Sequence, residues 1–187
     1  MIHRQPQIFV FFGMIATGKS TLAKMWAKAH EMFYYNSDVV RKEIAGSAAQ
    51  RSDKSSFGQG IYSSGFSQKT YACLLDKAET AVKSGQSVVL DASYSSIDNR
   101  QQVIALADKY SVTVCFIFCT CLEDEMRTRM EKRAQDPLAV SDGRWEIYLQ
   151  QKESFESLDH LGDQLITINT VQSPERLFEE LKTRCAS

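Results

Sequence analysis

An eight-residue segment near the N-terminus has the residue types and spacing of a phosphate-binding loop. Gly13–Ser20 matches the pattern Gly-x-x-x-x-Gly-Lys-Ser and lies between an apolar run and a helical pattern. Glycines allow backbone amides to face phosphate oxygens, and the helix that follows adds the positive end of its dipole. Lys19 is expected to reach the β- and γ-phosphates, and the Ser20 hydroxyl to bind Mg²⁺. We therefore predict that ATP is bound by Gly13, Met14, Ile15, Ala16, Thr17, Gly18, Lys19, Ser20 and Thr21.

A carboxylate and an arginine follow this loop within the segment Ser37–Arg41. Asp38 and Arg41 are one helical turn apart, so both side chains can face the same cleft. Asp38 could accept a proton from an attacking hydroxyl, and Arg41 could contact the acceptor or the transferred phosphate. The alternative is a surface helix, N-capped by Ser37, in which the two residues form an ion pair. Because a phosphate-binding loop precedes them, we favour the catalytic interpretation.

Asp91 ends another apolar segment, residues 87–91. In open α/β sheets, ligands bind at the carboxyl ends of the strands, so this acidic side chain is a candidate site residue. Three roles are open for it. Asp91 could hold Mg²⁺ through water together with Ser20, contact the acceptor, or cap a turn.

A group of arginines lies in a predicted helix over residues 123–133. Arg129 and Arg133 are four residues apart and share a helix face, whereas Arg127 points elsewhere. A break at residues 135–137 and a second helix indicate a helix-loop-helix lid over about residues 123–145. Arginines in such a lid neutralise charge that develops on a transferred phosphoryl group, which we expect of Arg129 and Arg133. The alternative is a solvated helix whose arginines pair with neighbouring acidic residues.

The segments around these residues alternate between strand and helix patterns. Apolar strand patterns occur at residues 8–12, 33–35, 87–91, 112–118 and 165–168. Helical patterns occur at residues 19–30, 37–44, 67–83, 97–110, 123–133, 144–155 and 174–184. Such alternation predicts a parallel sheet with helices on both faces. Residues 46–66, rich in Ser and Gly, are expected to form a long loop or flap within a single domain, residues 1–187.

The composition limits the classes of partner. The chain has 187 residues with 22 basic and 23 acidic side chains, and its net charge of −1 gives no overall attraction to nucleic acid or anionic membranes. The longest apolar stretch is too short to span a membrane, and the first residues lack the features of a signal peptide. Five cysteines without the spacing of a disulfide framework or a zinc site favour reduced thiols in the cytoplasm. No feature of the sequence indicates an oligomeric state.

Together these motifs resemble the small P-loop kinases. The resemblance rests on Gly13–Ser20, Ser37–Arg41, Leu90–Ser93 and the arginine helix followed by Ser141–Glu146, and it covers about residues 7–184. The group includes gluconate kinase, the kinase domain of polynucleotide kinase, chloramphenicol phosphotransferase and the zeta toxins. The sequence is most similar to a bacterial set of predicted ATP-dependent kinases within it.

The resemblance implies a P-loop NTPase three-layer α/β sandwich, with a five-stranded parallel sheet in the order 2-3-1-4-5 and a helical lid. It also implies transfer of the γ-phosphoryl group of ATP to a hydroxyl. By the same resemblance, Asp38 is the general base, Arg41 contacts phosphate, and Arg129 and Arg133 are lid residues. The adenine would lie against the lid and the loop of residues 169–174.

Three functions are compatible with these observations. We favour an ATP- and Mg²⁺-dependent kinase acting on a hydroxyl of a small molecule, because Asp38 provides a base on the acceptor side. A 5′-hydroxyl polynucleotide kinase shares the motifs, but the sequence has no basic run that would follow a phosphate backbone. A nucleotide-binding switch or ATPase without a small acceptor has no need of Asp38 and Arg41.

Overall fold

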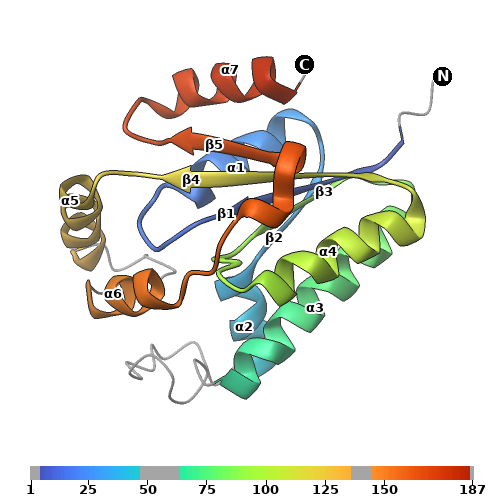
Figure 1. The fold of residues 1–187 in the computed structure, drawn as a ribbon, viewed down its shortest axis with the longest axis horizontal. Coiled ribbons are helices and arrows are strands. Elements are labelled where there is room, and N and C mark those ends of the chain that lie inside the picture. The colour runs from blue at the N-terminus through green and yellow to red at the C-terminus, as the bar shows by residue number, and fades with distance from the viewer. Residues whose placement is uncertain (1–4, 47–63, 136–144, 186–187) are drawn as a thin grey trace.

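Five parallel strands form the centre of the fold in the computed structural model, which describes residues 5–46, 64–135 and 145–185. Their order in the sheet is β2-β3-β1-β4-β5, and every neighbouring pair is parallel (Figure 1). The order predicted from the resemblance, 2-3-1-4-5, is confirmed. The strands are β1 (Gln7–Phe12), β2 (Phe33–Asn36), β3 (Val88–Asp91), β4 (Thr113–Thr120) and β5 (Leu165–Asn169).

The central strand β1 is buried on both faces, which explains its continuous apolar sequence. Because side chains alternate along a strand, Ile8, Val10 and Phe12 enter one hydrophobic core. Phe9 and Phe11 enter the other. The two cores lie on opposite sides of the sheet, so burial of β1 contributes to both at once.

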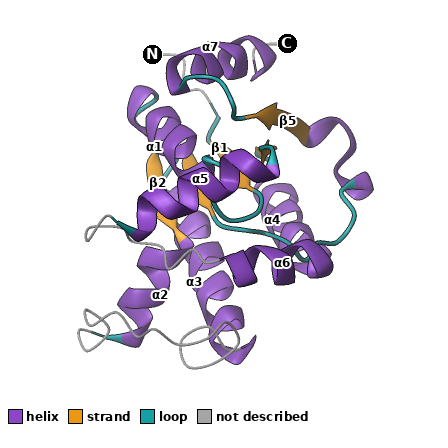
Figure 2. Cartoon of the chain, turned by 90° about the vertical axis from the view of Figure 1, so that its left-hand side faces the viewer, coloured by secondary structure: helices purple, strands orange, loops and turns teal. Residues whose placement is uncertain are grey.

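Helices cover each face of this sheet, giving three layers (Figure 2). The core containing Phe9 is closed by two helices, α1 (Lys19–Ala29) and α7 (Pro174–Cys185). The opposite core is closed by α2 (Ser37–Ala45), α3 (Ser64–Lys83), α4 (Ile97–Tyr110) and the short 3₁₀ helix η3 (Asp159–Gln164). The fold class predicted from the sequence is therefore the one observed. Among the elements of the described residues, η3 alone had no counterpart in the prediction.

Two further helices, α5 (Glu123–Ala134) and α6 (Trp145–Ser154), lie at the carboxyl end of the sheet (Figure 1). α5 lies within the lid predicted over about residues 123–145, and α6 begins where that range ends. We refer to α5 and α6 as the lid helices. The guanidinium of Arg127 lies 3.8 Å from the centre of the Trp145 ring and so links α5 to α6. Residues 136–144 of the lid, and residues 47–63 of the predicted flap, lie outside the described residues.

The helix that carries Asp38 begins differently from the sequence prediction. Asn36, and not Ser37, is its N-cap: the Asn36 Oδ1 accepts hydrogen bonds from the backbone amides of Asp38 and Val39, at 3.0 and 3.2 Å. The prediction of Ser37 was wrong because Ser37 is already the first residue of α2, and the residue before it supplies the cap. The Asn36 Nδ2 also donates to Asp91 on the neighbouring strand, so one side chain caps α2 and joins it to β3.

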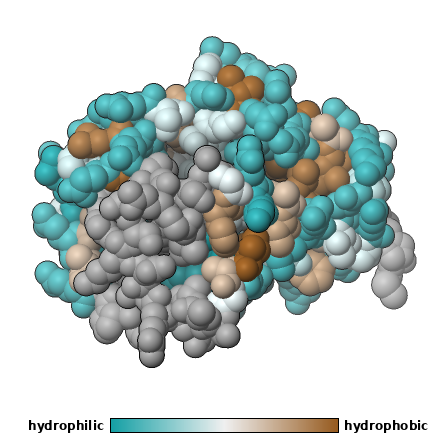
Figure 3. All heavy atoms as spheres, turned by 90° about the horizontal axis from the view of Figure 1, so that it is seen from below, coloured by the Kyte–Doolittle hydropathy of each residue, from teal (hydrophilic) through white to brown (hydrophobic). Residues whose placement is uncertain are grey.

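Among residues 5–46, 64–135 and 145–185, no helix combines the length and apolar character needed to cross a bilayer. The face shown in Figure 3 is mostly hydrophilic, with small separate apolar patches.

Candidate active site

The predicted phosphate-binding loop joins β1 to α1, as its position in the sequence indicated. Gly13 has φ of 134°, and a Cβ added there would lie 2.4 Å from the backbone oxygen of Cys119. Gly18 precedes the first residue of α1 with φ of 83°. Both positions therefore require glycine, the first because of strand β4 and the second because of the left-handed turn into the helix.

The lysine of the motif folds back over the loop. Its Nζ donates to the backbone oxygen of Met14 at 3.2 Å, and the Thr17 hydroxyl donates to the same oxygen at 2.8 Å. Lys19 and Ser20 are half-buried and line a cavity at the start of α1. An ammonium group and a helix N-terminus at one place form an anion-binding arrangement.

The apolar side chains of the loop pack against α5 and α6. Ile15 and Ala16 are buried in a small hydrophobic cluster with Met126 and Met130 of α5 and Tyr148 of α6. The lid helices therefore rest directly on the phosphate-binding loop. The apolar residues at the variable positions of the motif are explained by this packing.

A cavity of about 330 Å³ extends from the loop toward the sheet edge and the lid. Lys19 and Ser20 line one side, Asp38 and Arg41 of α2 line another, and Arg133 enters from α5. The cavity therefore brings together most of the charged residues that the sequence singled out. Its volume is within the range of small-molecule binding sites.

Asp38 and Arg41 form an ion pair inside this cavity, with 3.0 Å between Asp38 Oδ1 and Arg41 Nη1. The Asp38 side chain is 26% exposed, so it is open to the cavity while most of it is covered. Burial raises the pKa of Asp38 above its ordinary value, although the positive charges of Arg41 and Lys19 oppose this effect. The ion pair of the alternative interpretation is therefore present, and both of its residues line the cavity. The catalytic roles of Asp38 and Arg41 stay a prediction.

Asp91 lies behind this cavity and is completely buried. Its Oδ2 accepts hydrogen bonds from the Tyr34 hydroxyl at 2.6 Å and from Asn36 at 2.7 Å. Burial and the Asp91 charge raise the pKa of Tyr34, so its hydroxyl keeps the proton that it donates. The other oxygen, Oδ1, is also buried and has no hydrogen-bond partner among the described residues.

These residues fit a magnesium ion. Ser20 is a neighbour of Tyr34 in the network around Asp91, and the orphaned Oδ1 can accept a hydrogen bond from a metal-bound water. Within the described ranges no three His, Cys, Asp or Glu side chains are grouped to hold a metal. Mg²⁺ commonly takes one or two protein ligands and completes its shell with water and substrate phosphates, which suits this donor set.

Comparison with known proteins identifies the family of this chain. A family model described as an AAA domain, AAA_33, matches residues 8–158. The chain belongs to this family. Comparison of the sequence of this chain with curated proteins found no significant match.

Solved structures share the AAA_33 fold. A sugar kinase from Janibacter sp. HTCC2649 is 17% identical with a TM-score of 0.70, covering 98% of this chain and 95% of that chain. A gluconokinase from Sinorhizobium meliloti 1021 is 16% identical with a TM-score of 0.69, covering 97% and 92%. The Mycobacterium tuberculosis APS kinase CysC, in complex with AMPPNP and APS, is 16% identical with a TM-score of 0.66, covering 98% and 99%. The similarity to small P-loop kinases inferred from the sequence is confirmed at the level of the fold.

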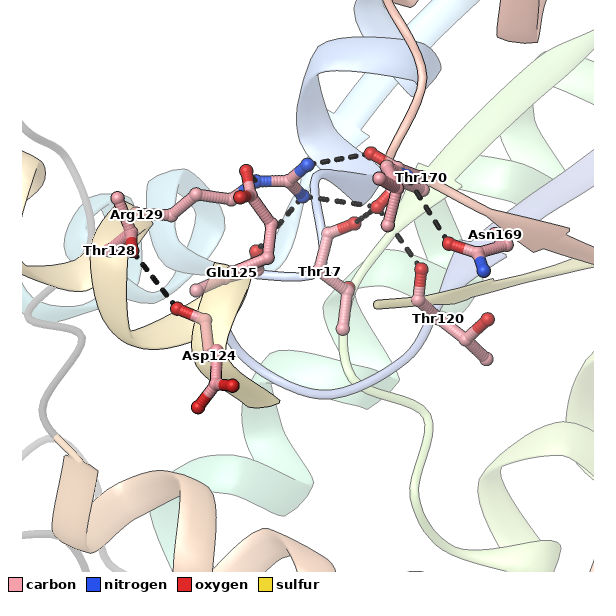
Figure 4. Close-up of polar contacts among 10 residues, drawn as sticks. Thr17, Thr120, Asp124, Glu125, Thr128, Arg129, Asn169 and Thr170 are labelled. Carbon is pink, nitrogen blue, oxygen red and sulfur yellow. Dashed lines mark hydrogen bonds and ion pairs between the residues drawn. The ribbon is translucent and has the colours of Figure 1, made fainter. Parts of the chain in front are cut away.

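The two lid arginines of the AAA_33 domain have different partners. Figure 4 shows Arg129 pointing to Thr170, in the loop after β5. Its Nη2 donates to the Thr170 backbone oxygen at 2.6 Å, and the Thr170 hydroxyl donates in turn to the backbone oxygen of Thr17. Arg129 thus joins the lid to the phosphate-binding loop and to the loop predicted to contact adenine. Of the two arginines, only Arg133 is among the described residues that line the cavity.

Sequence reasoning missed several residues around the cavity of this domain. Tyr71 of α3 contacts the Ser93 hydroxyl at 2.9 Å, and Gln151 of α6 reaches the phosphate-binding loop. Arg100 of α4 is fully buried and donates to the backbone oxygens of Tyr94 and Ser157. None belongs to a local motif. Only Arg100 gave a signal in the sequence, because it is a charged residue on the apolar side of a predicted helix.

Proposed function

We propose that this AAA_33 domain transfers the γ-phosphoryl group of ATP to a hydroxyl of a small-molecule acceptor. The observation that carries the proposal is the position of Asp38, whose carboxylate opens into the same cavity as Lys19 and the phosphate-binding loop. A carboxylate in this position can orient the hydroxyl of a second substrate and accept its proton. The raised pKa of Asp38 makes it a stronger base than an ordinary aspartate near neutral pH.

Phosphoryl transfer depends mainly on positioning and on charge stabilisation, and the cavity supplies both. The loop amides and Lys19 hold the phosphates, while Arg41 and Arg133 bring positive charge to the transferred group. Ser20 and Asp91 would hold Mg²⁺, which neutralises charge on the phosphate oxygens. Asp38 accepts a hydrogen bond from the acceptor hydroxyl, aligns its oxygen with the γ-phosphorus and takes its proton as the new bond forms.

The remaining wall of the cavity suits a hydroxylated acceptor. It is made of uncharged polar side chains, contributed by α3, the loop between β3 and α4, and α4 itself. They are Ser67, Gln68, Tyr71, Ser93, Ser95 and Asn99. Hydroxyl and amide groups pair with the alternating donors and acceptors of a polyol or a sugar. Two of the similar structures, a sugar kinase and a gluconokinase, are named for acceptors of this class.

The test is ADP release from ATP and Mg²⁺ in the presence of pooled acceptors: sugars and sugar acids, nucleosides, antibiotics and 5′-hydroxyl oligonucleotides. Lys19→Ala should abolish nucleotide binding, and Asp38→Asn should abolish transfer while ATP still binds. Lys28→Ala and Asp98→Asn are matched controls, because both residues are exposed and Asp98 also lies in the first turn of a helix.

The outcomes separate the candidate functions. Turnover raised by a small-molecule pool, and lost in Asp38→Asn, supports the proposal and identifies the acceptor class. Turnover raised only by oligonucleotides would identify a polynucleotide kinase. A slow ATPase rate that no pool raises, and that Asp38→Asn leaves unchanged, would refute the kinase and favour a nucleotide-binding switch.

A further inference from the structure

Gln151 makes a direct hydrogen bond from the lid to the phosphate-binding loop. The backbone amide of Ile15 donates to Gln151 Oε1 at 2.8 Å, across 136 residues of sequence. Both residues also line the cavity that holds Lys19 and Asp38. Gln151 is therefore a polar side chain held against the phosphate-binding loop in the cavity that Asp38 also lines.

This hydrogen bond fixes which way the carboxamide of Gln151 faces. A backbone N–H can only donate, so the atom that faces Ile15 must be the carboxamide oxygen. The NH₂ group is then on the other side of the planar carboxamide. Because Gln151 lines the cavity, we expect these two N–H donors to face a group bound between the loop and the acceptor wall.

The backbone of α6 is held in place independently of Gln151. The hydroxyl of the buried Tyr148 donates to Glu123 of α5 at 2.6 Å, and Lys152 forms an ion pair with the same carboxylate. Ile147, Gln151 and Ser154 follow one another at helical spacing and all line the cavity. The position of residue 151 is thus set by packing and by Glu123, and the loop sets the orientation of its side chain.

We propose that Gln151 is a catalytic residue whose NH₂ group donates a hydrogen bond to an oxygen of the γ-phosphoryl group during transfer. This inference rests on the proposed function. The transferred group must lie between Lys19 and Asp38, and the Gln151 carboxamide lines the same space. A donor oriented before the substrate binds stabilises the charge that develops on the phosphoryl oxygens without any cost of reorientation.

Two substitutions distinguish the role of the carboxamide oxygen from that of the NH₂ group. Gln151→Glu keeps an oxygen that accepts from the Ile15 amide but replaces the NH₂ donors with a negatively charged oxygen. Gln151→Met removes both the oxygen and the NH₂ group at nearly the same volume. Gln150→Glu is the control, because Gln150 is exposed on the same helix and the substitution adds the same charge.

Steady-state turnover with the acceptor is measured together with the dissociation constants of ADP and of a non-hydrolysable ATP analogue. Gln151→Met should lower kcat by about 100-fold, the effect of losing one preorganised donor, and Gln151→Glu should lower it further because it adds a negative charge next to the phosphoryl oxygens. Gln151→Glu should also weaken binding of the ATP analogue by about tenfold relative to binding of ADP, since only the analogue carries a γ-phosphate. Gln150→Glu should leave every value unchanged.

Two results would overturn the inference. One is a Gln151→Glu protein with the same kcat and the same ratio of analogue to ADP affinity as Gln150→Glu. The other is an equal loss of ADP and analogue binding in Gln151→Met together with a lower melting temperature, which indicates a purely structural link. If the wild-type protein phosphorylates no acceptor, the proposed function fails, but the ratio of the two nucleotide affinities still tests Gln151.

Discussion

Replacement of Arg100 by methionine is expected to destabilise the protein substantially. The Arg100 guanidinium is fully buried, and its shortest hydrogen bonds are to the backbone oxygens of Tyr94 at 2.5 Å and Ser157 at 2.6 Å. It also contacts the Glu156 backbone oxygen and His160, each at 3.3 Å. One side chain therefore connects the loop between β3 and α4, which borders the cavity, to the chain that leaves α6.

The magnitude follows from the two short bonds. Hydrogen bonds to a charged group contribute about 1.5–3 kcal/mol each, so two represent about 3–6 kcal/mol. Methionine keeps the apolar contacts of the stem and removes the cost of burying a charge, which offsets part of that loss. We expect a net loss of about 2–4 kcal/mol in the free energy of unfolding. In a chain of this length that corresponds to a melting temperature lower by about 5–15 °C.

Urea denaturation and a thermal melt measure this effect. Gln101→Met is the control, because Gln101 is exposed on the same helix and should tolerate methionine within about 0.5 kcal/mol. Arg100→Lys keeps the charge but lacks the planar fork that reaches several carbonyls, and it should lose nearly as much as Arg100→Met. An Arg100→Met protein as stable as Gln101→Met would refute the view that this guanidinium holds the two loops together.

Three further predictions concern the loop, the helix that carries Asp38 and the dependence of stability on pH. Gly13→Ala places a Cβ 2.4 Å from a backbone oxygen of β4 and should cost about 2–4 kcal/mol and weaken ATP binding. Gly85→Ala, also at positive φ but with open space around the Cβ, should cost less in the same melt; equal losses would contradict the steric argument. Asn36→Ala removes a helix cap and should cost about 1 kcal/mol. Asn36→Asp keeps the cap but places a second carboxylate against that of Asp91, so it should lower the urea midpoint more than Asn36→Ala does. An Asn36→Asp protein as stable as the wild type would disprove the contact between residues 36 and 91. Partial desolvation and the neighbouring Arg100 guanidinium lower the pKa of the exposed His160, so the folded protein binds its proton less readily than the unfolded chain. The stability that depends on a neutral His160 is therefore fully present above the pKa that this histidine has in the unfolded chain. It is lost as the pH falls from that value to the lower pKa of the folded protein. Urea midpoints at several pH values should therefore decline less toward acid in His160→Gln, and parallel curves would exclude His160 as the cause.

Local patterns accounted for the fold and for the phosphate-binding loop. Gly13–Ser20 and the apolar run before it are contiguous, so their arrangement follows from the chain itself. The spacing of Asp38 and Arg41 placed both on one side of α2 for the same reason. The order of the strands came from the resemblance to small P-loop kinases, because alternation of strands and helices does not determine it.

The remaining site residues depend on contacts that no local pattern records. The hydrogen bond between Ile15 and Gln151 spans 136 residues. Arg129 and Arg133 have the same spacing as any pair one turn apart, and only the packing of α5 decides that one binds Thr170 while the other lines the cavity. Such choices are made by tertiary packing and so could not be predicted from the sequence.

The packing of Ile15 and Ala16 against the lid has a consequence for protein engineering. In this domain the variable positions of the phosphate-binding loop are one half of a hydrophobic interface, and Met126, Met130 and Tyr148 are the other half. A loop transplanted from another nucleotide-binding protein would bring the right glycines and lysine but the wrong surface for these three side chains. Loop and lid therefore form one exchangeable unit, and chimeric proteins that retain nucleotide binding should be those in which both are replaced together.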